Sequence, residues 1–184
     1  RAKVTLSRLA DRRLLIRSLD ATGSGLKVKA AGSRTILGGL RFSGDLTMSN
    51  LAAARKGASG VMTAKWSAAR GGSGKPWAGT AYARFAKVAT GRAELDRLLG
   101  PTPRLQAKAA YHDNAWAFSE ARLDGAAGDV SAAGLFGPDG ALKFTLDWNA
   151  SGPFTAGPVE IAGKVKGDGA LTGTLDAPRA DLNA

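Results

Sequence analysis

Three groups of residues in this chain have side chains that catalysis or ligand binding could use. His112 and Asp113 could act as the base and orienting acid of a nucleophilic site. Residues 71–76 contain the glycines and the lysine of a phosphate-binding loop. Glu120, together with Asp124 and Asp129, could supply the paired carboxylates of a glycoside hydrolase.

None of these groups completes its motif. No Gly-x-Ser-x-Gly elbow accompanies His112, and a His beside Asp at a turn is typical of a solvated loop. A phosphate loop needs Gly at position 69 and Ser or Thr at position 76, where this chain has Ala69 and Pro76. Asp124 and Asp129 fall in predicted turns, and the chain has no Cys and one His. We therefore expect no enzymatic activity, no cofactor and no metal site.

The charge is unevenly distributed along the chain. Residues 1–92 hold 18 Lys and Arg against 3 Asp and Glu, a net charge of +15, whereas residues 93–184 hold 8 against 12, a net charge of −4. Such a first half suits an anionic partner, either nucleic acid or an anionic membrane surface, and the alternative is a solvated face that keeps the chain soluble.

Nucleic acid is the weaker of these partners. Trp66, Trp77, Tyr82 and Phe85 lie among the basic residues and could form an aromatic and basic binding surface. The Lys and Arg residues are scattered, however, and no nucleic-acid-binding signature is present. We expect no nucleic-acid partner.

The elements that would position any site are mostly short strands. In residues 141–150, Leu142, Phe144, Leu146 and Trp148 alternate with polar residues, and a period of two places them on one face of a sheet. The last strands are predicted at 104–111, 115–123, 128–136, 141–149, 158–166 and 169–176, with a turn at 167–169. Residues 49–57 and 91–99 have the start and stop signals of short helices, and residues 71–74 read as a flexible linker.

The apolar residues favour one curved sheet over a closed sandwich. Ala and the 25 glycines dilute the large apolar side chains, and no second layer is evident in the pattern. We predict an all-β fold, a curved and mostly antiparallel sheet with one or two short helices and an open groove on its apolar concave face. Its predicted lining is Leu40, Phe42, Leu46, Leu142, Phe144, Leu146 and Trp148.

Several segments resemble the TamB family. They are residues 169–182 with their Gly-Thr-Leu-x-x-Pro core, Gly-Lys-Val-Lys-Gly at 163–167, Leu-Leu-Gly-Pro at 98–101 and Leu-Asp-Gly at 123–125. TamB is the inner-membrane-anchored subunit of the translocation and assembly module, and it is related to AsmA-like and bridge-like lipid transfer proteins. The strand-rich sequence pattern of most of the chain is also similar to that of the family.

The resemblance implies a fold, a location and partners. The fold would be a β-taco whose apolar groove conducts phospholipid acyl chains between the inner and outer membranes, in the periplasm, with the anchor of the parent protein outside this piece. The partner of the parent chain would be an outer-membrane barrel protein like TamA. The family's other implied role is a chaperone or scaffold surface for outer-membrane β-barrel proteins. We expect residues 1–184 to be a single segment of a longer repeat-built protein.

Overall fold

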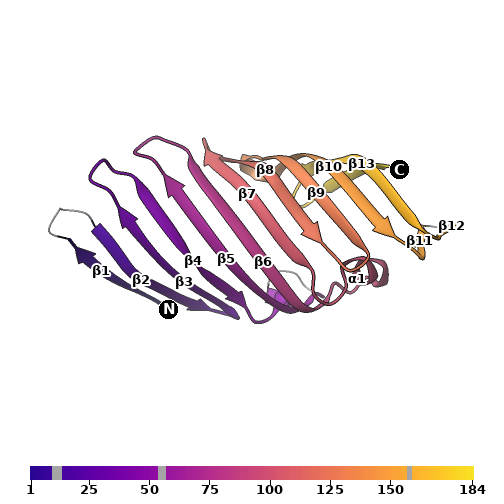
Figure 1. Cartoon of the computed structure of the whole chain (residues 1–184), viewed down its shortest axis with the longest axis horizontal. Helices are drawn as coiled ribbons and strands as arrows, with labels where there is room; N and C mark the ends of the chain where they lie inside the picture. Colours follow the sequence, from indigo (N-terminus) through magenta and orange to yellow (C-terminus); the bar gives the residue numbers. More distant parts are fainter. Residues whose placement is uncertain (10–13, 54–56, 157–158) are drawn as a thin grey trace.

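The structure is a computed structural model that describes residues 1–9, 14–53, 57–156 and 159–184. In this part of the chain, twelve strands form one antiparallel sheet (Figure 1). Strands β1 to β10 lie side by side in chain order, and β13 and β14 follow β10. The strands are β1 (Ala2–Arg8), β2 (Leu14–Gly23), β3 (Leu26–Arg34), β4 (Leu40–Met48), β5 (Ser59–Arg70), β6 (Trp77–Ala89), β7 (Arg104–His112), β8 (Ala115–Asp124), β9 (Gly128–Phe136), β10 (Ala141–Ser151), β13 (Lys164–Thr174) and β14 (Pro178–Asn183). Between β10 and β13, a separate hairpin of β11 (Phe154–Ala156) and β12 (Val159–Ile161) leaves the sheet. The predicted all-β antiparallel sheet is confirmed.

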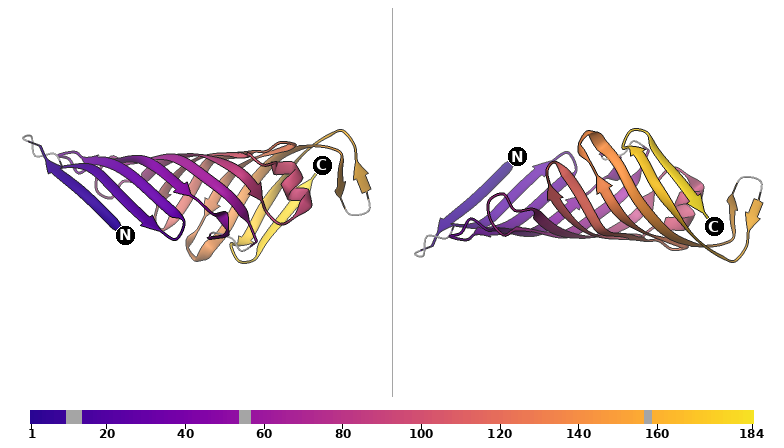
Figure 2. Two further views of the ribbon diagram at one scale, coloured as in Figure 1. Left: turned by 90° about the horizontal axis from the view of Figure 1, so that it is seen from below. Right: turned by 90° about the horizontal axis from the view of Figure 1, so that it is seen from above.

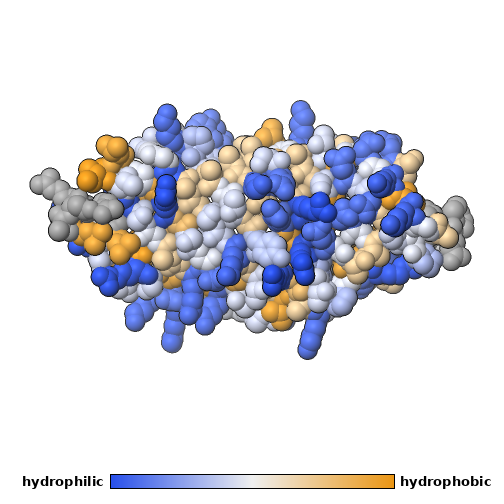
Figure 3. Space-filling model, viewed as in Figure 1, coloured by the Kyte–Doolittle hydropathy of each residue, from blue (hydrophilic) through white to orange (hydrophobic). Residues whose placement is uncertain are grey.

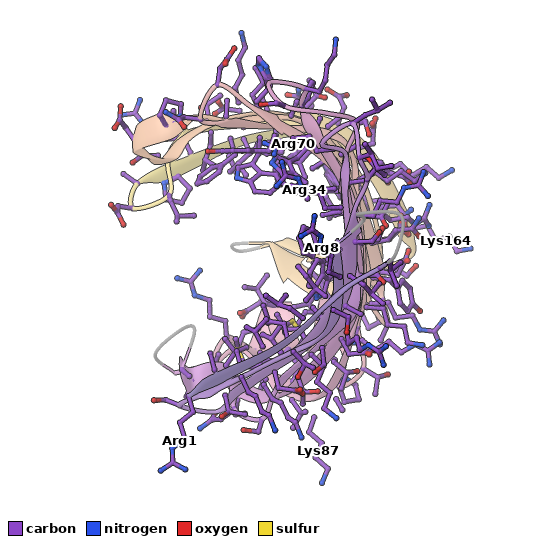
Figure 4. All side chains as sticks on the ribbon, turned by 90° about the vertical axis from the view of Figure 1, so that its left-hand side faces the viewer. Arg1, Arg8, Arg34, Arg70, Lys87 and Lys164 are labelled. Carbon is purple, nitrogen blue, oxygen red and sulfur yellow. The ribbon has the colours of Figure 1, made fainter. Side chains whose placement is uncertain are left out.

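The sheet is strongly curved, and its two faces differ. Seen end-on it bends into a U, with Arg34 and Arg70 inside the bend and Lys164 outside it (Figure 4). We call the inner side, which carries Phe42 and Phe144, the concave face, and the side that carries Lys164 the outer face. Views from below and from above show that the sheet stays curved along its length (Figure 2).

Glycines on the concave face explain part of this curvature. The register places Gly32 opposite Phe42 and Gly167 opposite Trp148. A Cβ at Gly32 would collide with the Phe42 ring, and one at Gly167 would lie 2.7 Å from the Trp148 ring. Because the inside of a bend has less room than the outside, small residues there let the strands fold inward without steric conflict. Other glycines inside strands on this face include Gly44, Gly79, Gly134, Gly169 and Gly173.

One short helix closes the lower edge of the sheet in Figure 1. This helix is α1 (Ala93–Leu99), as the sequence predicts for residues 91–99. The carbonyl oxygens of Leu98 and Leu99 accept hydrogen bonds from the amides of Ala127 and Ala126 at 2.9 and 3.0 Å, so the end of the helix is tied to the turn between β8 and β9. No described helix is long and apolar enough to span a membrane.

A carboxylate also ties the start of α1 to the preceding strand. The Thr90 amide donates a 2.5 Å hydrogen bond to Asp96, and this bond holds the pKa of the Asp96 carboxyl below its ordinary value.

Three predictions of local structure are wrong. The helix expected at 49–57 is a 3₁₀ turn, η1 (Leu51–Ala53), and residues 54–56 lie outside the described part. The expected turn at 167–169 lies inside β13, which replaces the predicted strands 158–166 and 169–176. The expected linker at 71–74 is part of the turn between the paired strands β5 and β6. A second 3₁₀ turn, η2 (Pro138–Gly140), joins β9 to β10 at a predicted turn.

Candidate functional site

The concave face carries all of the residues predicted to line a groove. Strand pairing continues without interruption from β4 to β10, so the residues from these two strands share one face although five strands separate them. They do not form one compact pocket. The residues are Leu40, Phe42 and Leu46 on β4, and Leu142, Phe144, Leu146 and Trp148 on β10.

Strands between β4 and β10 fill this face with further apolar side chains. The rings of Phe118 and Phe144 pack with centroids 5.6 Å apart, and those of Phe42 and Trp77 with centroids 6.0 Å apart. Such tilted pairs are a favourable arrangement of aromatic rings. Period-two alternation would also have found further members that the sequence analysis omitted, among them Met62, Trp66, Phe85, Leu105, Tyr111, Trp116, Leu123, Val130, Phe136 and Leu171.

No second layer covers the concave face in the described residues. Ala30, Ala83 and Ala150 are the aliphatic or aromatic residues that are buried there, and no large side chain among the described residues is fully buried. Phe42, Phe144 and Trp148 are only half-buried. In a sandwich or a lidded sheet the facing layer would exclude water from such residues. The face is therefore an open apolar surface.

Residues with reactive side chains lie elsewhere and do not converge. His112 and Asp113 form an exposed 2.7 Å contact at the turn between β7 and β8. Glu120 pairs with Lys108 at 2.6 Å on the outer face. Among the described residues, no group of three or more His, Cys, Asp and Glu could hold a metal ion.

Asp124 and Asp129 are likewise engaged on the outer face. Both contact Arg122, with oxygen to nitrogen distances of 2.7 and 3.9 Å, and a hydrogen bond from Arg122 to Asp124 raises the pKa of the guanidinium. These carboxylates therefore balance an arginine and are not arranged as an acid and base pair.

The outer face is polar and has a shallow hollow. Figure 3 faces this side and shows hydrophilic side chains over much of it, with a band of residues of intermediate hydropathy between them. A hollow of about 920 Å³ lies there between β2 and β8, and its lining is rich in alanine, as at Ala31, Ala69 and Ala78, with the hydroxyls of Ser67 and Thr80 among them. The Ser67 and Thr80 hydroxyls are hydrogen-bonded at 2.9 Å, so these groups satisfy one another.

Three arginines are the charged side chains that the described strands of the sheet place on the concave face. Arg8 and Arg34 both align with position 14 of β2, and Arg34 and Arg70 both align with Leu40 of β4. The Arg70 guanidinium lies 5.1 Å from the centre of the Trp77 ring, and the Arg70 Nε is buried without a hydrogen-bond partner. The sequence analysis missed this row, in which each arginine is the last residue of its strand.

No family model, no curated protein and no solved structure matches this chain.

Proposed function

We propose that the concave face holds lipid acyl chains, and that the chain is a non-enzymatic segment of a TamB-like protein that conducts phospholipids between the inner and outer membranes. The observation that carries this proposal is the apolar face that continues across the sheet with no layer over it in the described residues. The family likeness rests on the sequence resemblance alone.

The size of the face suits acyl chains. Twelve strands spaced about 4.8 Å apart give an apolar surface roughly 50 Å long across the strands. An acyl chain spans half of a bilayer core of about 30 Å, and a strand of 9 residues such as β4, at about 3.3 Å per residue, is long enough for one such chain to lie along it. Each methylene removed from water contributes about 0.8 kcal/mol, which favours a chain lying along the face over one in solvent.

The separation of aromatic and basic residues argues against the nucleic-acid alternative. Trp66, Trp77 and Phe85 lie on the concave face, whereas Lys65 and Tyr82 align with each other on the outer face. A single-strand binding surface needs aromatic rings and cations on the same side. In the described strands of the sheet, the cations that share the concave face with these aromatic residues are Arg8, Arg34 and Arg70, which lie in one row at one edge.

Site-specific photo-crosslinking tests the proposal. A photoreactive residue at Phe144 should form adducts with phospholipid in cells or vesicles, and one at Thr145, the next position on the outer face, should not. Lipid extracted from the purified chain and identified by mass spectrometry should contain diacyl species.

Other outcomes would contradict it. Equal lipid labelling at both positions, or none at Phe144, would remove the lipid-conducting function. Labelling of outer-membrane proteins in place of lipid at Phe144 would favour the chaperone or scaffold role for β-barrel assembly.

A further inference from the structure

Along one edge of the concave face, the residues that pair directly across neighbouring strands form a row with a distinctive composition. Arg8, Arg34 and Arg70 occupy β1, β3 and β5 in this row. Because they lie on alternate strands, their backbone positions are about 10 Å apart. Figure 4 shows all three side chains inside the bend. The row continues through aromatic residues, namely Trp77, Tyr111, Trp116 and Phe136.

The chemistry of the three arginines favours an anionic partner. The register places every Asp and Glu of the described sheet strands on the outer face, so no carboxylate of these strands balances the row from the concave side. Arg70 is stacked on Trp77, and its buried Nε has an unused donor. A guanidinium group presents a planar fork of donors that matches phosphate oxygens.

The opposite edge of the same face is different. There the row consists of Leu26, Met48, Met62 and Phe85, with no charged side chain. The concave face thus changes from cationic and aromatic at one edge to apolar at the other. Trp and Tyr side chains are typical of the level at which lipid headgroups meet acyl chains, because their rings are apolar and carry a polar group.

We propose that the arginine row, Arg8, Arg34 and Arg70, binds the phosphate of a phospholipid whose acyl chains extend toward the Met48 and Met62 edge. This inference rests on the proposed function, and it assigns the orientation of the lipid on the concave face. The phosphate lies at the edge of the concave face where β1, β3 and β5 end. The aromatic residues continue this headgroup level across β6 to β9.

Binding of two chain-matched lipids tests the inference. The purified chain is titrated with phosphatidylglycerol and with diacylglycerol that carry the same fluorescent acyl chain. The unmodified chain should bind phosphatidylglycerol about tenfold or more tightly than diacylglycerol, because only the former has a phosphate for charge-assisted hydrogen bonds. The triple variant Arg8→Gln, Arg34→Gln and Arg70→Gln should lose this preference and keep its affinity for diacylglycerol.

A matched variant separates the row from overall charge. Lys29→Gln, Arg41→Gln and Lys65→Gln remove three charges from the outer face of β3, β4 and β5 and should leave the preference intact. Equal loss in this variant would overturn the inference. The exposed single variant Arg34→Gln, which should lower phosphatidylglycerol affinity about threefold or more, replaces the triple variant if that one does not fold.

The remaining outcomes are also decisive. A phosphate preference that survives in the triple variant, or unchanged affinity in Arg34→Gln, would overturn the arginine row as the headgroup site. Equal binding of both lipids by the unmodified chain would overturn the row and leave the proposed function standing. Binding of neither lipid would overturn the proposed function itself, and the headgroup inference with it.

Discussion

The two faces of one sheet share the same backbone hydrogen bonds and differ in almost everything else. Along β10, Phe144 and Leu146 are half-buried on the concave face, whereas Lys143, Thr145 and Asp147 are exposed on the outer face. Ion pairs such as Lys108 with Glu120 lie on the outer face, and the glycines opposite aromatic rings lie on the concave face. The difference teaches that alternation here separates a solvated face from an apolar face over which the described residues place no second layer.

The difference between the two faces also indicates which interactions stabilise the sheet. With only alanines buried among the aliphatic and aromatic residues described, packing across a core contributes little. Backbone pairing and cross-strand contacts on one face must supply most of the stability. Substitutions on the concave face should therefore have large effects, and adjacent substitutions on the outer face should have small ones.

The largest expected effect comes from a charge placed among the concave aromatic residues. Phe144→Asp removes the ring that packs on Phe118 and puts an unpaired carboxylate beside it. We expect the free energy of unfolding to fall by about 2 kcal/mol or more, and bound lipid to be lost. Urea unfolding and lipid mass spectrometry measure the two effects.

Thr145→Asp is the control for this prediction. It adds the same carboxylate one residue away on the outer face, at the cost of the 3.2 Å hydrogen bond from the Thr145 hydroxyl to the Ala133 carbonyl. Its effect on stability should stay below about 1 kcal/mol, with lipid retained. Similar losses in both variants would show that the two faces are equivalent.

An intermediate effect is expected where an aromatic ring covers a glycine. In Gly167→Ala the new Cβ would meet the Trp148 ring and the Asn183 carbonyl oxygen of β14. Forcing these groups apart should lower the free energy of unfolding by about 1 to 3 kcal/mol and change the near-ultraviolet circular dichroism of the tryptophans. The neighbouring Lys166→Ala is exposed and should change stability by about 0.5 kcal/mol or less. If Gly167→Ala were as mild as Lys166→Ala, the glycines would not be needed for the close approach of ring and strand.

Alternation in the sequence was enough to predict strand β10 and the side of the sheet on which its residues lie. Where that prediction failed, turn chemistry was given too much weight. Residues 167–169 have the Gly and Asp residues of a turn, but Gly167 and Gly169 continue the period-two phase of Val165 and Leu171 inside β13. The Ala-rich segment at 49–57 had helical end signals but no apolar stripe for packing, and Leu51–Ala53, within its described part, form a 3₁₀ turn.

The arginine row needed information that the local sequence does not contain. Arg8, Arg34 and Arg70 lie 26 and 36 residues apart, and only the pairing of five strands brings them into one row. The position of each arginine at the end of a strand is visible in the sequence, but the face and the register are not. The same limit applied to the aromatic residues that continue the row.

The smallest expected effect is on the outer face, where solvent screens charge. Lys108 and Glu120 form a 2.6 Å ion pair across β7 and β8, and their side chains are 52% and 39% exposed. Such pairs contribute little, because the charges are already solvated and ordering two long side chains costs entropy. Glu120→Gln should lower the free energy of unfolding by about 0.5 kcal/mol or less, and 1 M salt should reduce the difference further. A loss as large as that expected for Phe144→Asp would mean that electrostatic pairing on the outer face, and not the apolar packing inside the bend, determines the stability of the sheet.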